Sequence, residues 1–180
     1  DRSGDGSWPA RPLWVCAVEL DRGDRVVVGR DGIDVPIGVA VQASSSIPGL
    51  VRPVVHHGRR YVDGGVHSPT NADLLADEGL DLVVVVSPMS TTTEGRRAAI
   101  ASARPLHAGR LAAEVARLRR AGTAVLTFQP TTADIVAMGR NPLDLRRRAP
   151  AAESAFESAR SRLLDPTIAE RVEMLIATSG

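Results

Sequence analysis

The chain has 180 residues, which suits one domain with a sizeable apolar core. Apolar residues make up 43% and charged residues 24%, as in a soluble globular protein, and the formal net charge of +1 creates no global field that selects nucleic acid or a membrane. The single cysteine, Cys16, excludes an internal disulfide, and no long apolar run or hydrophobic signal core occurs, so we expect a cytoplasmic protein.

The N-terminal part of the chain is expected to be rich in strands. Gly, Ser, Pro and charged residues fill 1–12, which is the composition of a linker, so we expect the folded part to occupy 13–180. Apolar runs at 12–20 and 25–29 predict two strands of a hairpin.

A short helix and a second hairpin should come next. Asp34 is expected to cap the helix, with Pro36 in its first turn. A loop at 44–49 then leads to a hairpin that turns at Gly58.

The chain then alternates between helix and strand. Ser68 and Pro69 are expected to begin a helix that ends at Gly79. The segment 80–88 holds four valines in a row without polar alternation, which predicts a strand covered on both faces, as in a parallel sheet. The polar segment 89–104 should be irregular.

The C-terminal part should contain one long helix, one strand and a helical tail. The helix is expected from Pro105 to Ala121 and the strand over 123–130, and the tail is divided at Pro166. The apolar side chains of the tail are expected to pack in the core, and they are Phe156, Leu163, Leu164, Val172 and Leu175. This order of elements predicts an α/β fold with a partly parallel sheet.

Asp63 is the main candidate for chemistry. It follows an apolar strand and precedes Gly64 and Gly65, which can turn with positive φ and leave room for a close approach. An Asp at such a strand end can orient or deprotonate a nucleophile, hold a metal, or simply cap a turn.

The segments AVQASSSIPGLVRPV and GRRYVDGGVHSPTNADLLADEGLDLVVVVS resemble the C-terminal half of patatin-like phospholipases, over roughly 13–130. The resemblance implies a three-layer patatin-like sandwich with a partly parallel central sheet, of which 13–180 would supply the C-terminal portion. It also implies that Asp63 pairs with a nucleophilic Ser in a Ser-Asp dyad, and that Gly64 and Gly65 shape the substrate site.

The nucleophile of that family lies in a Gly-x-Ser-x-Gly elbow, and this pentapeptide does not occur in the sequence. We therefore expect the Ser on a separate N-terminal half of the hydrolase, and this chain alone to be nearly inactive. The alternative is a non-catalytic half-domain or interaction module that keeps the fold without the nucleophile.

Other polar clusters have simpler explanations. The triplet 44–46 lacks flanking glycines and is expected to be a structural loop. His56 and His57 are neighbours on a strand and point to opposite faces, so they are not expected to bind one metal ion. His67 should be a loop residue near the site, and His107 a residue at the edge of the core.

The expected partners follow from the resemblance and the composition. The substrate would be a lipid or another ester, and neither a metal nor an organic cofactor is required. The run 146–148 of three arginines is a weak nucleic-acid signal and is expected to be a solvated loop, with contact to anionic lipid headgroups as a lesser expectation. We therefore expect no nucleic acid and a cytoplasmic location with peripheral membrane contact.

Overall fold

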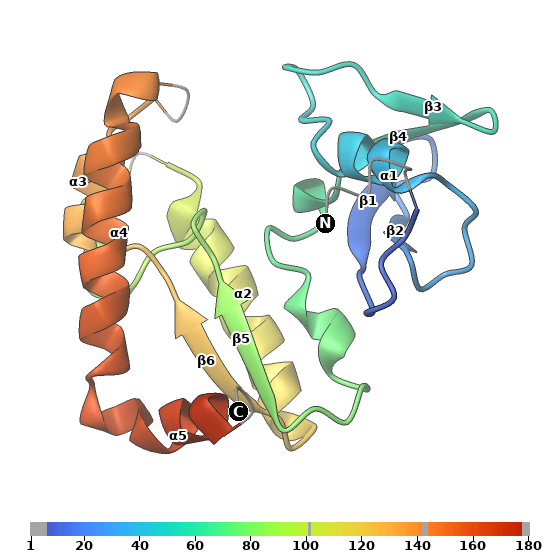
Figure 1. Ribbon diagram of the computed structural model, residues 1–180. Coiled ribbons are helices and arrows are strands. Elements are labelled where there is room, and N and C mark those ends of the chain that lie inside the picture. The colour runs from blue at the N-terminus through green and yellow to red at the C-terminus, as the bar shows by residue number, and fades with distance from the viewer. Residues whose placement is uncertain (1–6, 101, 142–143, 178–180) are drawn as a thin grey trace. The chain divides into compact units, whose positions relative to one another are not determined.

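The computed structural model describes residues 7–100, 102–141 and 144–177 (Figure 1). The chain divides into two units, residues 1–71 and 72–180. Each unit has its own apolar core, so each is described by itself.

The first unit is a four-stranded antiparallel sheet covered by one helix. The strands are β1 (Val15–Glu19), β2 (Arg25–Val28), β3 (Val54–His56) and β4 (Arg59–Asp63), in the order β2-β1-β4-β3. Helix α1 (Ile37–Ser44) buries Ala40 and Ala43 against this sheet. Trp8 packs on the same core and donates its indole N–H to the carbonyl of Val35 at 2.9 Å.

Both hairpins of the first unit are confirmed, but the predicted helix cap is wrong. The β3–β4 hairpin turns at His57 and Gly58, which have φ angles of 47° and 74°. Pro36 occupies the N-cap position of α1, where no side chain accepts a hydrogen bond, so Asp34 lies outside the helix. Because proline has no side-chain oxygen, the N-cap position cannot accept a hydrogen bond from the first N–H groups of α1.

The second unit contains a two-stranded parallel sheet and four α-helices within the described residues. The strands are β5 (Leu82–Val86) and β6 (Ala124–Phe128), and the helices are α2 (Arg104–Arg120), α3 (Thr132–Met138), α4 (Arg148–Leu163) and α5 (Ala169–Ala177). Short 3₁₀ turns join them: η2 (Ala72–Leu75), η3 (Glu94–Arg96), η4 (Leu145–Arg147) and η5 (Pro166–Ile168). Helix α2 connects the two parallel strands and is seen beside them in Figure 1.

Helix α2 covers one face of this sheet. Leu111, Val115 and Leu118 are buried, as their spacing predicts, and they pack against Val83 and Val125. On the other face the exposed fraction is 41% for Val84 and 69% for Val86. The prediction that both faces of 80–88 are covered is therefore wrong in the described residues, where only the side facing α2 is fully packed.

The helix expected between Ser68 and Gly79 does not form. Only the 3₁₀ turn η2 occurs there, because Asn71 has a φ of 49° and interrupts any helix that begins at Ser68. Helix α3 was not predicted. The tail helices are confirmed, but Phe156, Leu163 and Leu164 are exposed rather than part of the core. The side chain of Leu175 lies outside the described residues.

The structure has a mixed α/β architecture with one antiparallel and one parallel sheet, which confirms the predicted fold class. Within the residues that the structure describes, no helix is both long enough and apolar enough to cross a membrane.

Candidate functional site

Asp63 is the last residue of β4, next to the central strand β1 of the antiparallel sheet. Its Cα pairs with that of Ala17, and its backbone N–H donates to the carbonyl of Ser46 at 3.1 Å. The 3₁₀ turn η1 (Gly64–Val66) begins directly after it. Asp63 is therefore held by backbone contacts to two separate segments, and its side chain is half-buried.

The side chain of Asp63 folds back onto the turn that it caps. Its Oδ1 accepts a hydrogen bond of 2.7 Å from the backbone N–H of Gly65. This bond fixes the orientation of the carboxylate through one oxygen. Such a fixed carboxylate suits a dyad, in which the Asp must reach its partner without an intervening His.

Of the two reasons expected for the glycines, positive φ and room for a close approach, only the second holds, and it holds at Gly64. Neither Gly64 nor Gly65 has a positive φ, so the expectation of left-handed turning is wrong. A Cβ on Gly64 would instead lie 2.4 Å from the carbonyl oxygen of Cys16 and 2.7 Å from its carbonyl carbon. Gly64 therefore allows the turn after Asp63 to approach the backbone of β1 closely.

Asn71 completes the turn and was missed in the sequence. Its Nδ2 donates to the carbonyl of Ser68 and, at 3.4 Å, to that of Gly64. Its Oδ1 accepts from Arg25 at 3.2 Å. Asn tolerates the left-handed conformation that this position requires, and an Asn within a Ser-Pro-Thr-Asn stretch is the signal that could have indicated it.

The serine triplet does not present a hydroxyl to Asp63. Ser44 ends α1 and Ser45 is its C-cap. Ser46 is fully buried, and its hydroxyl donates to the carbonyl of Gln42 at 2.8 Å. The main-chain carbonyl of Ser46 accepts the backbone N–H of Asp63, so this segment helps to hold the backbone from which the carboxylate projects.

The expectation that His56 and His57 point to opposite faces is wrong, because His57 follows the end of β3 with a φ of 47° and the two rings meet edge-on at 4.1 Å between centroids. Nε2 of His56 lies 3.1 Å from the carbonyl oxygen of Asp34. His67 is exposed at the end of η1, four residues after Asp63. His107 is half-buried on α2, and burial lowers its pKa, with Arg110 and Arg104 lowering it further. No group of three or more potential metal ligands occurs in the described residues.

A buried carboxylate, Asp134, was also missed. It caps α3 with Thr131, since its Oδ2 accepts from both the backbone N–H and the hydroxyl of Thr131 at 2.8 Å. Its Oδ1 accepts from Ser154 at 2.6 Å and from Ser158 at 3.0 Å, both on α4. The spacing Thr131-x-x-Asp134 is a capping box and could have revealed both the helix and the carboxylate.

Hydrogen bonding keeps Asp134 ionised. Burial raises the pKa of this carboxyl, but the bonds from Ser154, Thr131 and Ser158 outweigh it and hold the pKa below its ordinary value of 3.8. A carboxylate with this environment is a poor base, and its role is to join α3 to α4.

Two sizeable cavities lie in the second unit. One, of about 780 Å³, lies beside Val86, Phe128 and Phe156. The other, of about 860 Å³, lies between the beginning of α2 and the segment that leads into α4. Asp63, in the first unit, is not among the residues that line either cavity.

Residues 12–76 match the family model described as patatin-like phospholipase. The match lies in the N-terminal part of the chain, and it contains the whole of the Asp63 turn. This part of the chain is therefore similar to patatin-like phospholipases, whereas the resemblance in the sequence was drawn over roughly 13–130.

Proposed function

We propose that the chain supplies the Asp of a patatin-like lipid acyl ester hydrolase. Asp63 is the residue of a Ser-Asp dyad that accepts the proton of the nucleophile. The single observation that carries this proposal is the coincidence of the patatin-like match with a carboxylate fixed at a strand end by the N–H of Gly65.

In the proposed reaction a Ser hydroxyl attacks the carbonyl carbon of an ester while Asp63 takes its proton. The C–O bond to the alcohol then breaks, the alcohol leaves with that proton, and an acyl-enzyme remains. Water, deprotonated by Asp63, attacks the acyl-enzyme and releases the fatty acid and the Ser hydroxyl. Backbone N–H groups of the nucleophile-bearing segment would stabilise the oxyanion.

The nucleophile would come from outside these 180 residues, since the sequence has no Gly-x-Ser-x-Gly elbow. In this proposal residues 13–180 are the C-terminal portion of the hydrolase domain, and the N-terminal half carries the Ser. Gly64 and Gly65 then form the wall of the substrate site next to Asp63. The chain by itself should be nearly inactive, because loss of one dyad member removes most of the catalysis.

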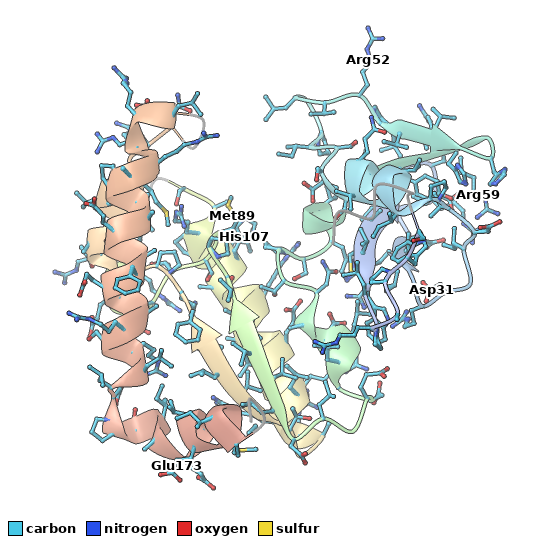
Figure 2. The ribbon with its side chains drawn as sticks, viewed as in Figure 1. Asp31, Arg52, Arg59, Met89, His107 and Glu173 are labelled. Carbon is cyan, nitrogen blue, oxygen red and sulfur yellow. The ribbon has the colours of Figure 1, made fainter. Side chains whose placement is uncertain are left out.

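A lipid surface is the proposed site of action. The segment after Ser46 exposes Ile47, Leu50 and Val51, with Leu50 67% exposed, and Arg52 projects from its end (Figure 2). Exposed apolar residues followed by a cation suit peripheral contact with a membrane. Flotation with phosphatidylcholine vesicles tests this contact, since Leu50→Ser should reduce binding; binding unchanged by that substitution would contradict it.

Fluorophosphonate labelling of the purified material, followed by a denaturing gel and intact mass, tests the dyad. A second, labelled polypeptide is expected, and hydrolysis of a p-nitrophenyl ester should fall by about a thousandfold or more in Asp63→Asn. The exposed Asp24, in the β1–β2 turn, provides a matched control, and Asp24→Asn should leave hydrolysis unchanged. Label on this chain itself, or full activity in Asp63→Asn, would refute the proposal.

The second candidate is a non-catalytic half-domain or interaction module. The missing elbow motif favours it, whereas the retention of Asp63 with both glycines favours the hydrolase. Monodisperse, folded material with no label and no second polypeptide would support the module.

A further inference from the structure

The cavity of about 860 Å³ in the second unit has a basic wall. Among the residues that line it, Arg104 and His107 lie on α2, and Arg147 and Arg148 lie where η4 meets α4. Asp144 is the acidic residue in this lining, and its carboxylate already accepts from Arg146 at 2.9 Å. The cavity therefore carries an excess of positive charge.

Arg104 is held in place by main-chain groups. Its guanidinium donates to the carbonyls of Pro88 and Ser90, the latter at 3.1 Å, and also contacts the sulfur of Met138 at 3.3 Å. No carboxylate lies within ion-pair distance of Arg104 in the described residues. Burial lowers its pKa, yet an arginine remains charged in a protein. A partly buried cation without a counter-ion favours the binding of an anion.

His107 provides a second, independent sign of a ligand. Its Nδ1 is buried and has no hydrogen-bond partner in the part of the chain that the structure describes. Buried polar atoms are nearly always hydrogen-bonded, so an unpartnered nitrogen on a residue that lines a cavity suggests a group that is bound nearby in function. His107 and Met89, which also lines the cavity, are labelled together in Figure 2.

The beginning of α2 adds a third contribution. Its N-cap is Ala103 and its first turn has no acidic residue. The N–H of Arg104 already donates to Ser102 Oγ at 3.3 Å and Pro105 has no N–H, so this end of the 17-residue helix contributes mainly the positive end of its dipole. On the opposite wall, the side chain of Arg147 packs against Gly139. A Cβ added to Gly139 would lie 3.3 Å from Nε of Arg147.

We propose that this cavity binds a phosphate group. Arg104 and the start of α2 would hold one side of the oxyanion, His107 would donate to it, and Arg147 and Arg148 would close the other side. The remaining wall is apolar, with Met89, Ala99 and Ile135, and can accept an aliphatic substituent on the phosphate. This site lies wholly in the second unit and goes beyond the proposal for Asp63.

Isothermal titration of the full chain with inorganic phosphate and with dihexanoyl phosphatidic acid, at constant ionic strength, tests the site. Arg147→Gln and His107→Leu should each weaken phosphate binding by about tenfold. Arg120→Gln, at the far end of α2, removes the same charge and should leave binding unchanged. Circular dichroism verifies folding, and Arg147 is exposed, so this variant remains informative if His107→Leu does not fold.

Phosphatidic acid that binds about tenfold more tightly than inorganic phosphate would support the site and identify a lipid headgroup as the source. Equal affinities would support a site for a phosphate group alone. Absence of binding by both probes, or equal weakening in Arg120→Gln, would overturn the proposal.

Discussion

Replacement of Gly64 by Ala tests the close approach that positions Asp63. The new Cβ would lie 2.4 Å from the carbonyl oxygen and 2.9 Å from the Cβ of Cys16. These atoms belong to the central strand of the sheet, so they cannot move aside as a flexible side chain could. Such overpacking costs about 1–3 kcal/mol, and the smaller entropy of the unfolded Ala chain offsets only about 0.5 kcal/mol of it.

We therefore expect Gly64→Ala to lower the free energy of unfolding of the first unit by about 2 kcal/mol. For a unit of 71 residues this corresponds to a fall in melting temperature of about 8–16 °C. The protein contains two tryptophans, Trp8 and Trp14, and both lie in the first unit. Their fluorescence during thermal or urea unfolding reports on this unit specifically.

Gly38→Ala is the matched control. Gly38 lies in α1, and a Cβ at this position meets no atom within 4 Å. Because Ala is the better helix former, this change should raise the free energy of unfolding by about 0.5–1 kcal/mol. If Gly64→Ala were as stable as the wild type, or were stabilised like Gly38→Ala, the turn after Asp63 would not approach β1 as described.

Two further predictions concern the second unit. Asp134→Ala should lower its stability by about 2 kcal/mol, since it removes the cap of α3 and the bonds to α4, and circular dichroism at 222 nm measures the loss. The pKa of folded Asp134 lies below the unfolded value of 3.8, so its contribution to the free energy of unfolding should be complete above pH 3.8 and disappear as the pH falls below it. If the stability of Asp134→Ala and of the wild type fell equally at acid pH, this reasoning would be contradicted. Leu118→Ala should cost about 2–5 kcal/mol, because Leu118 is fully buried, and a cost like that of an exposed Leu106→Ala would show that α2 does not pack as described.

The sequence predicted elements well where one pattern dominates. Helix α2 was placed almost to the residue, because Leu111, Val115 and Leu118 repeat on one face and Gly122 follows the end. Strand β6 was also placed correctly, since an apolar run stops at Pro130. In these cases local preference and tertiary packing favour the same structure.

The segment between Ser68 and Gly79 shows where such patterns fail. Ser68 followed by Pro69 is typical of a helix start, but the hydroxyl of Ser68 accepts hydrogen bonds from the N–H groups of Thr70 and Asn71 in a tight turn. Asn71 then adopts a left-handed backbone and binds the carbonyl of Gly64. A tertiary contact to the Asp63 turn thus overrides the local preference, and sequence spacing does not reveal that contact.

The candidate site could be located from the sequence but not explained from it. Asp63 stands out because two glycines follow a strand, and the structure places it at a strand end as expected. The role of Gly64 depends on the carbonyl of Cys16, a residue distant in the sequence. Only the register between β1 and β4 brings the two together.

The exposed valines of β5, Val84 and Val86, favour aggregation of the protein. Residues 82–87 combine high β-propensity with no charge, no proline and no glycine, and Val84 and Val86 remain open on one side. Segments of this kind form intermolecular cross-β contacts most readily. Strand β5 is therefore where we expect aggregation to begin at high concentration or during slow refolding.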